Sequence, residues 1–248
     1  DPRDLHSFPT RRSSDLNRRL PHRLPGILLS LAKSRYYEGA ASRCADLLVF
    51  QSPYDRDDFL SRVGSARGRS VVVRGNIGEP RFAAAYADAN RSSGVSTVLF
   101  IGTFGERKGI KYFMEAASLL CRAGLDLRFR IVGFGARRAH WEEYARKEGI
   151  ADRVSFLGRL SDPFPVLAEA DLLVVPSLFD SYPNTVLEAL HAGTPVIASA
   201  VGGIPDMLRR DELLFPPRDG RAIAERVERC VRDRSEERRV GKECRSRW

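Results

Sequence analysis

The stretch DLLVVPSLFDSYPNTVLEALHAGTPVIAS (171–199) decides the fold, because it predicts two buried strands with a helix between them. The first run, DLLVVPS (171–177), is apolar without polar alternation, which predicts a strand covered on both faces. A helix is predicted over 184–191, and Gly193 ends it before the second strand, PVIAS (195–199). Strand, helix and strand in this order form the repeating unit of a parallel α/β sheet.

The same unit recurs on both sides of this stretch. Strands are predicted at 96–102, 127–133, 154–158, 171–177, 195–199 and 213–217. Helical periodicity separates them and is clearest over 108–122 and 219–233. We therefore predict the α/β class, with a Rossmann-like doubly wound parallel sheet whose ligand lies beyond the carboxyl ends of the strands.

A shorter α/β stretch precedes this domain. It contains a predicted helix around 26–42, a strand at 46–52, a helix at 53–63 and a strand at 70–76. Two or three such units are too few to close a stable sheet, so we predict that this first domain is truncated. The predicted domains are a remnant over 17–80, a linker over 81–95 and a second domain over 96–233.

Both ends of the chain are predicted to be artefacts of sequence assembly. A single DNA duplex that resembles a short-read sequencing adapter encodes RDLHSFPTRRSSDL (3–16) on one strand and RSEERRVGKECRSR (234–247) on the other. Two unrelated basic tails would need this complementarity by chance. Residues 1–16 and 234–248 are therefore excluded from the prediction of the fold.

The chain is basic, with a net charge of +9. Residues 1–16 carry no net charge, and setting aside the +3 of 234–248 leaves +6 on 17–233. This charge favours contact with phosphates or with an anionic membrane surface. No basic motif with interleaved aromatic residues indicates nucleic-acid binding. The apolar run PGILLSLA (25–32) is too short to span a bilayer, which needs about 20 residues.

The chain has four cysteines, of which Cys244 lies in the predicted artefactual end. The other three, Cys44, Cys121 and Cys230, are isolated and fall at apolar helical positions. This spacing indicates buried thiols in a reducing compartment rather than disulfides or a metal site. We therefore predict a cytoplasmic protein. The basic residues around 17–23 add the expectation of peripheral contact with the inner face of an anionic membrane.

Two glycine-rich turns follow predicted strands. IGTFGERKG (101–109) places Lys108 just before a helix, which suits phosphate binding, although an ordinary strand–helix turn is the alternative. The loop is not a Walker A motif, because Gly109 rather than Ser or Thr follows the lysine. GFGARRA (133–139) lacks the third glycine of the dinucleotide fingerprint and is interpreted as a turn.

The acidic run YDRDD (54–58) contains a weak match to a metal-binding Asp-x-Asp motif. Both Asp55 and Asp57 fall in the first turn of the predicted helix 53–63, where carboxylates favour the helix dipole. We interpret them as a solvated helix start, and we expect no metal site in this protein.

Asp180 and Glu188 are the acids that draw attention in the opening stretch. Asp180 follows a buried strand at the expected ligand edge, and Glu188 lies among apolar residues inside the helix 184–191. Solvated acids are the alternative interpretation.

The pattern Asp180-x7-Glu188 resembles the E-x7-E region of the retaining family-4 glycosyltransferases, which have the GT-B fold. Other segments resemble that family in the same order along the chain: FIGTFGERKG, RFRIVGFG, RVSFLGRL, ADLLVVPS, ALHAGTPVIAS and VGGIPDML. The resemblance is strong over 96–233 and loose over 44–76.

The resemblance implies roles for individual residues. Glu188 would bind the ribose hydroxyls of a nucleotide-sugar, and Asp180, where the family usually has Glu, would face the donor sugar. Lys108 and the backbone amides of Asn184 and Thr185 would hold the diphosphate. The other implied donor-binding residues are Gly102, Thr103, Arg107, Gly158, Arg159 and Tyr182.

The resemblance thus implies an enzyme that moves a sugar from a nucleotide-sugar to a sugar or lipid-linked acceptor with retention of configuration, without a metal cofactor. The leaving diphosphate would be stabilised by Lys108 and the helix start. Two alternatives remain: a fragment that binds nucleotide without catalysis, and a Rossmann oxidoreductase.

Overall fold

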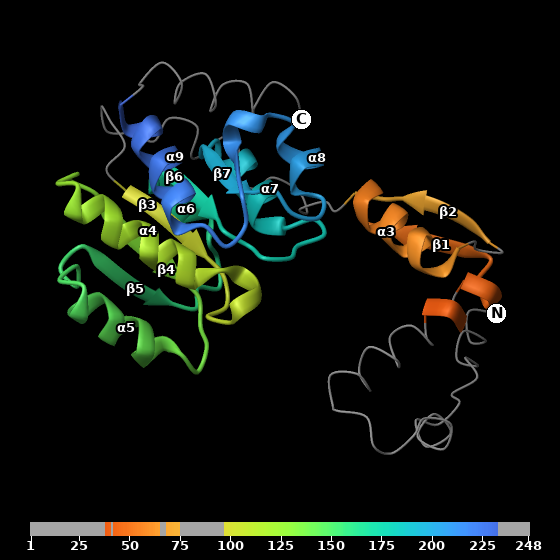
Figure 1. The fold of residues 1–248 in the computed structure, drawn as a ribbon, viewed down its shortest axis with the longest axis horizontal. Helices are drawn as coiled ribbons and strands as arrows, with labels where there is room; N and C mark the ends of the chain where they lie inside the picture. The colour runs from red at the N-terminus through yellow and green to blue at the C-terminus, as the bar shows by residue number, and fades with distance from the viewer. Residues whose placement is uncertain (1–37, 41, 65–67, 75–96, 233–248) are drawn as a thin grey trace. The chain divides into compact units, whose positions relative to one another are not determined.

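The computed structural model describes residues 38–40, 42–64, 68–74 and 97–232 of this chain (Figure 1). The predicted artefactual ends, the predicted linker and most of the predicted helix 26–42 lie outside these ranges. The chain divides into two compact units, one that contains 56–72 and one that contains 97–232.

The first unit contains one strand–helix–strand unit. Strand β1 (Leu47–Phe50) pairs in parallel with β2 (Arg69–Val72), and helix α3 (Pro53–Val63) connects them. The rings of Phe50 and Phe59 pack 5.4 Å apart, so the apolar side of the helix covers the strand. The predicted strand–helix–strand order is therefore confirmed.

The start of α3 explains its acidic run. The hydroxyl of Ser52 accepts a hydrogen bond from the backbone N–H of Asp55 at 3.0 Å and donates one to its carboxylate at 2.7 Å. Asp57 forms an ion pair with Arg56. Ser52 thus caps the helix, and the two acids pair with their neighbours, which confirms the prediction of a helix start. Asp57 is exposed as predicted, whereas Asp55 is half-buried.

The second unit contains a six-stranded parallel sheet in the order β5-β4-β3-β6-β7-β8. Its strands are β3 (Thr97–Ile101), β4 (Arg128–Val132), β5 (Val154–Gly158), β6 (Leu172–Val175), β7 (Val196–Ser199) and β8 (Leu214–Phe215). This order confirms the predicted doubly wound sheet. The last strand is shorter than predicted, because the two prolines that follow it cannot donate ladder hydrogen bonds.

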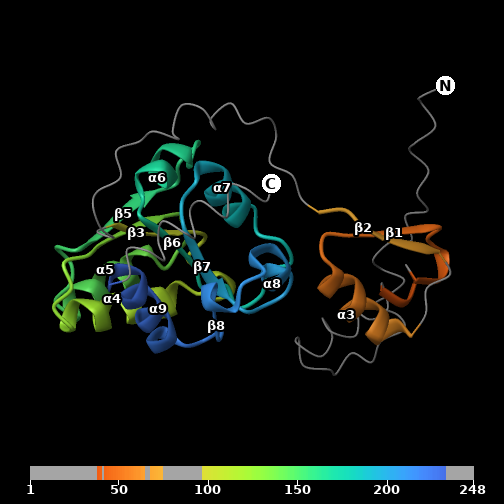
Figure 2. The same ribbon diagram turned by 90° about the horizontal axis from the view of Figure 1, so that it is seen from above.

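Helices cover both faces of this sheet (Figure 2). On one face lie α4 (Ile110–Arg122), α5 (Arg138–Lys147) and α9 (Gly220–Arg232). On the other lie α6 (Phe164–Glu169) and α7 (Asn184–Ala192). Helix α8 (Ile204–Leu208) lies between β7 and β8 in the chain. Within the described ranges, every helix falls short of the length and hydrophobicity that a bilayer crossing requires.

The core follows from the predicted periodicity. Phe113 of α4 is buried between Phe100 of β3 and Phe129 of β4, with ring centroids 5.4 and 6.0 Å apart. The expectation of buried thiols is wrong in part. Cys44 is exposed, whereas Cys121 and Cys230 are half-buried at the margin of the helical faces.

Strands β3 and β6 are neighbours at the centre of the sheet, and their following helices lie on opposite faces. Such a switch point leaves a crevice at the carboxyl ends of the strands. There Gly109 adopts a left-handed conformation (φ +71°), and a Cβ atom on it would lie 1.8 Å from the carbonyl oxygen of Pro176. Only glycine lets the two loops approach this closely.

The substitution Gly109→Ala should therefore lower the free energy of unfolding by more than about 3 kcal/mol, because it combines a strained φ with a backbone clash. Gly124→Ala is the matched control, since Gly124 has a similar φ (+77°) and no atom within 4 Å of an added Cβ. It should cost only about 1–2 kcal/mol. Equal losses for the two variants in chemical denaturation would contradict this account of the switch point.

Candidate functional site

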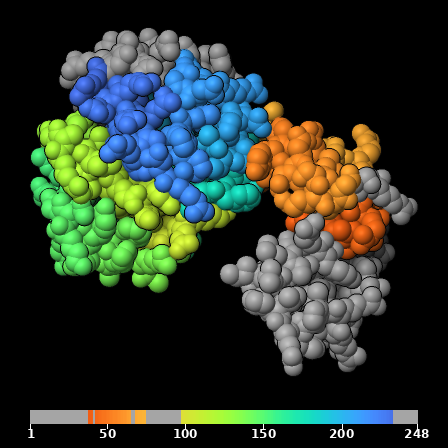
Figure 3. All heavy atoms as spheres, viewed as in Figure 1, coloured from red at the N-terminus to blue at the C-terminus, as the bar shows by residue number. Residues whose placement is uncertain are grey.

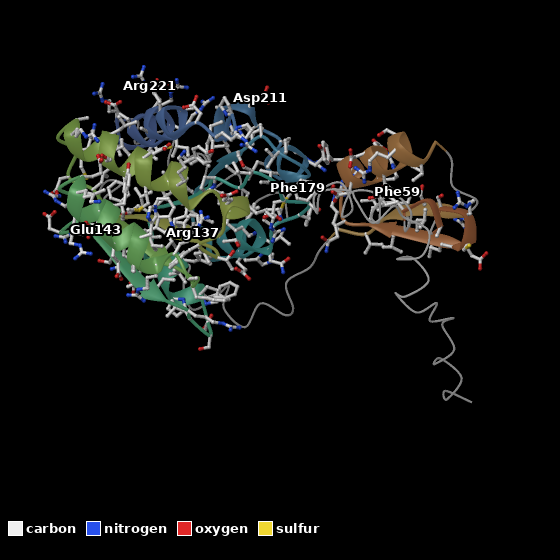
Figure 4. The ribbon with its side chains drawn as sticks, turned by 60° about the horizontal axis from the view of Figure 1, so that its bottom comes forward. Phe59, Arg137, Glu143, Phe179, Asp211 and Arg221 are labelled. Atoms are coloured by element: carbon white, nitrogen blue, oxygen red, sulfur yellow. The ribbon has the colours of Figure 1, made fainter. Side chains whose placement is uncertain are left out.

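The candidate site is built on two loops at the switch point. The first follows β3 and contains the 3-10 turn η1 (Glu106–Lys108), and the second joins β6 to α7. The backbone N–H of Leu178 donates a hydrogen bond to the carbonyl of Arg107 at 2.7 Å, which joins the loops directly. Figure 4 marks the second loop by Phe179, whose side chain is exposed.

Lys108 and Asp180 form an ion pair across these loops, with Nζ and Oδ2 2.6 Å apart. The hydroxyl of Ser177 donates a second hydrogen bond to the same carboxylate oxygen at 3.3 Å. The two side chains are only 20% and 11% exposed, so the pair is largely shielded from water. The structure thus brings together two of the predicted site residues.

The first turn of α7 lies directly after Asp180. Pro183 occupies the N-cap position, and no side chain caps the helix. The N–H of Val186 donates to the carbonyl of Pro183, whereas within the described residues the N–H groups of Asn184 and Thr185 have no acceptor. Unpaired N–H groups at a helix start attract anions. Tyr182, also predicted for the site, is buried beside this turn.

Glu188 lies on α7 and is half-buried. Burial raises the pKa of its carboxyl group, and the negative charge of Asp162 adds to the increase. Asp162 belongs to the loop between β5 and α6, so Glu188 lies near that loop. The structure shows no contact between Glu188 and Asp180 among the described residues, so the two predicted acids occupy separate parts of the site.

Two more predicted residues, Gly158 and Arg159, end β5. The carbonyl of Gly158 accepts a hydrogen bond from the N–H of Gly133 at 2.8 Å, which ties the ends of β5 and β4 together. The guanidinium of Arg159 lies 5.0 Å from the ring centre of Phe134, and both side chains are exposed. Phe134 was not predicted for the site, although an aromatic residue inside a glycine-rich turn was the available signal.

The loop after β3 holds the remaining predicted residues. Gly102 donates its N–H to the carbonyl of Val132, while the side chains of Thr103 and Arg107 are exposed. Arg107 contacts the second loop through its backbone carbonyl, and its role as a second cation stays a prediction.

A third loop reaches Asp180 and was missed as part of the site. The N–H of Gly203 donates to the carbonyl of Asp180 at 3.3 Å, and a Cβ atom on Gly202 would lie 2.0 Å from that oxygen. The signal in the sequence was the pair of glycines in VGGIPDML, because adjacent glycines after a strand permit close backbone approach. Within the described part of the chain, no group of three or more His, Cys, Asp or Glu residues is placed to hold a metal.

A doubly wound sheet with a basic side chain and an uncapped helix start at its switch point defines a Rossmann-like domain with the features that attract anions in such folds. Residues 95–233 match the family described as Glycosyl transferases group 1, and the chain belongs to this family. Its architecture is that of the GT-B glycosyltransferases. Membership in this family argues against the oxidoreductase alternative.

Individual relatives agree with this assignment. The chain is 31% identical over 185 residues to 2-deoxystreptamine glucosyltransferase of Streptomyces kanamyceticus, covering 70% of this chain and 48% of that protein. It is also 31% identical over 140 residues to alpha-D-kanosaminyltransferase of the same organism, covering 55% and 36%. The chain thus spans between about a third and a half of these curated relatives.

Among solved structures, sucrose-phosphate synthase from Thermosynechococcus elongatus superposes with a TM-score of 0.73 at 28% identity, covering 87% of this chain and 56% of that one. WaaG, a glycosyltransferase involved in lipopolysaccharide biosynthesis, superposes with a TM-score of 0.72 at 20% identity, covering 94% and 66%. The second similarity concerns the fold alone.

Replacing Glu188 by Gln should stabilise the ligand-free protein at neutral pH. The pKa of Glu188 is raised in the folded state, so its ionised form opposes folding above that pKa. The gain should shrink as the pH falls through the folded pKa, and vanish below the unfolded value of about 4.5. Thermal melts of the parent protein and of Glu188→Gln at several pH values between about 4 and 8 measure this difference in stability. The exposed Glu143→Gln, on α5 (Figure 4), is the control and should show no such gain. A gain that is independent of pH would contradict the explanation.

Removing the charge of Lys108 should destabilise the protein, because the buried carboxylate of Asp180 would then have no cationic partner. Lys108→Met is expected to lower the free energy of unfolding by about 3 kcal/mol. Adding Asp180→Asn should recover part of this loss, because the uncompensated charge disappears. The control Lys147→Met removes an exposed partner of Glu143 and should change stability little. Additive effects in a double-mutant cycle would contradict a coupled pair.

Proposed function

We propose that the switch-point site binds a nucleotide-sugar and that the protein transfers its sugar to an acceptor with retention of anomeric configuration. The observation that supports this most directly is the placement of Lys108 and the uncapped start of α7 around one crevice. Together they offer positive charge and free N–H groups to a diphosphate.

The order of the side chains along the sheet edge suits the parts of such a donor. The base would lie next to Gly158 and Arg159, and Glu188 would accept hydrogen bonds from the ribose hydroxyls. The diphosphate would bind the amides of Asn184 and Thr185. Two solved structures of similar fold contain UDP: TarM from S. aureus and HepE from Anabaena. Those ligands belong to those proteins and support the proposal by analogy of fold.

The ion pair gives Lys108 two roles. Without donor, its charge is neutralised by Asp180 at 2.6 Å. A bound diphosphate would compete for the ammonium group, and the carboxylate of Asp180 would then face the donor sugar. In this scheme donor binding exchanges one ion pair for another, so Lys108 is positioned before the ligand arrives.

The chemistry follows from where charge develops. The bond between the anomeric carbon and the diphosphate oxygen breaks, and negative charge accumulates on the leaving group. Lys108 and the dipole of α7 stabilise this charge, and removing one such donor typically costs about 3–4 kcal/mol of barrier. The acceptor hydroxyl attacks on the side that the diphosphate leaves, and its proton passes to the departing phosphate. Retention results.

The larger organisation is also part of the proposal. Residues 96–233 would form the donor-binding domain, and residues 17–80 would belong to the acceptor-side domain. The acceptor would be a sugar or a lipid-linked sugar, and the basic composition of the chain would favour peripheral contact with an anionic membrane. We expect the cytoplasmic face of that membrane to be the place of action.

Binding of UDP-, GDP- and ADP-sugars to the full chain tests this function by saturation-transfer NMR and calorimetry. One donor class should bind, and Glu188→Ala should weaken it by tenfold or more, as expected for losing a charged hydrogen-bond partner. Glu143→Ala is the control, because Glu143 is exposed on α5 (Figure 4). Binding should also weaken toward acidic pH, because protonated Glu188 loses acceptor capacity and its pKa is raised.

Two outcomes would count against the proposal. Binding of none of the three nucleotide-sugars would remove its basis, and equal effects of Glu188→Ala and Glu143→Ala would place the donor elsewhere. Release of nucleoside diphosphate in the presence of acceptor sugars separates transfer from the alternative of binding without catalysis.

A further inference from the structure

The second unit contains a cavity that the proposed donor site does not use. Its volume is about 340 Å³, at the lower end of the range for small-molecule sites. It lies between the loop after β3, the first turns of α4 and α5, and the loop before α9. Figure 3 shows the surface of this unit, with α4 in yellow-green, α5 in green and α9 in blue. None of the residues assigned above to the donor lines this cavity.

The charge of the cavity wall is positive. Its lining residues include three cations, Lys111, Arg137 and Arg218, and one carboxylate, Glu106, which leaves an excess of two positive charges on the wall. Lys111 also lies 3.8 Å from the carboxylate of Glu115, outside the wall, in an exposed and therefore weak ion pair. The distance from Nη1 of Arg137 to Oε1 of Glu106 is 3.6 Å. Both side chains are largely exposed, so this ion pair is weak. Figure 4 shows Arg137 near the start of α5. A wall of this kind favours a small dianion.

Arg218 reaches the cavity through an unusual backbone conformation. Its φ is +65°, in the left-handed region that a residue such as Arg rarely adopts. The start of α9 fixes this position, because Gly220 packs against the Tyr112 carbonyl and the Glu115 side chain of α4. Strain of this kind persists where the surrounding structure imposes it, and it concentrates at binding sites.

The rest of the wall is aromatic. Tyr112, His140 and Trp141 line the cavity, and the rings of His140 and Trp141 meet edge to face at 4.7 Å. The indole Nε1 of Trp141 is buried and has no acceptor among the described residues. Aromatic rings beside cations suit a ligand that combines an anionic group with a compact ring bearing C–H groups and hydroxyls.

We propose that this cavity is a second binding site, which takes the phosphate monoester of a sugar-sized molecule. Arg137, Arg218 and Lys111 bind the phosphate, since arginine matches phosphate oxygens in a bidentate geometry. Tyr112, His140 and Trp141 contact the sugar. The volume is too small for a whole nucleotide-sugar, which separates this ligand from the proposed donor. Because the cavity wall includes Glu106, two residues before Lys108, its ligand lies against the loop that holds the proposed diphosphate lysine.

The chain provides its own reporter for the test. Its two tryptophans are Trp141 and Trp248, so Trp248→Phe leaves Trp141 as the only indole fluorophore. The full-length variant is titrated with glucose 6-phosphate, inorganic phosphate and glucose, and calorimetry is run in parallel. We expect glucose 6-phosphate to bind and to shift Trp141 emission, phosphate to bind more weakly, and glucose to have no effect.

Three variants locate the binding. Arg137→Gln and Arg218→Gln should each weaken glucose 6-phosphate about tenfold or more, the loss expected for one charged hydrogen bond. Arg221→Gln is the matched control, because Arg221 is exposed on α9 and does not line the cavity (Figure 4). It should leave the affinity unchanged.

Lys108→Met separates this inference from the proposed function. It should weaken nucleotide binding while glucose 6-phosphate still binds. Loss of glucose 6-phosphate binding in Lys108→Met would overturn the second site, since the ester would then occupy the donor site. Absence of binding in both fluorescence and calorimetry at millimolar ligand, or an equal loss in Arg218→Gln and Arg221→Gln, would overturn it as well. Phosphate that binds as tightly as the ester would overturn the role of the aromatic wall.

Discussion

The backbone contact between the ends of β3 and β6 is the constraint on which the site depends. Gly109 lies against the carbonyl of Pro176, and Leu178 donates to the carbonyl of Arg107. These contacts fix two loops that leave the sheet in opposite directions, so side chains on either loop meet at defined positions. The pair formed by Lys108 and Asp180 follows from that geometry, since its members come from different loops.

The polar groups at this edge of the sheet could each gain a new hydrogen-bond or ion-pair partner from the proposed nucleotide-sugar. Lys108 is neutralised by an internal carboxylate, the amides that start α7 have no acceptor among the described residues, and Glu188 is half-buried near another acid. The unpaired amides and the half-buried carboxyl of Glu188 oppose stability in the empty protein, whereas the ion pair of Lys108 with Asp180 supports it. Under the proposed function, a bound diphosphate and ribose hydroxyls would give each of these groups a new partner. The half-burial of Glu188 therefore explains why a substitution of this residue can stabilise the empty protein and still weaken binding of the proposed nucleotide-sugar.

The loop after β3 has two sides with different neighbours. Lys108 faces the β6–α7 loop, whereas Glu106 contributes to the wall of the basic and aromatic cavity. Because both belong to one short 3-10 turn, a ligand in the cavity and a ligand at the switch point would contact the same structural element. Coupling between the two sites would then require only that each prefers a particular position of this turn.

The sequence by itself determined the order of strands and helices, because runs of apolar residues report local burial on both faces of a sheet. It also placed Asp180 and Lys108 at loop positions after strands, where ligands of parallel sheets bind. Only the tertiary structure decided that these two residues pair across 72 positions of sequence, and that Glu188 lies near Asp162 rather than Asp180. The cavity beside Arg218 could not be predicted from the sequence either, and the only signal for the contact of Phe134 with Arg159 was an aromatic residue inside a glycine-rich turn. Local periodicity carries no information on which loops become neighbours, since strand order and close glycine contacts set those distances.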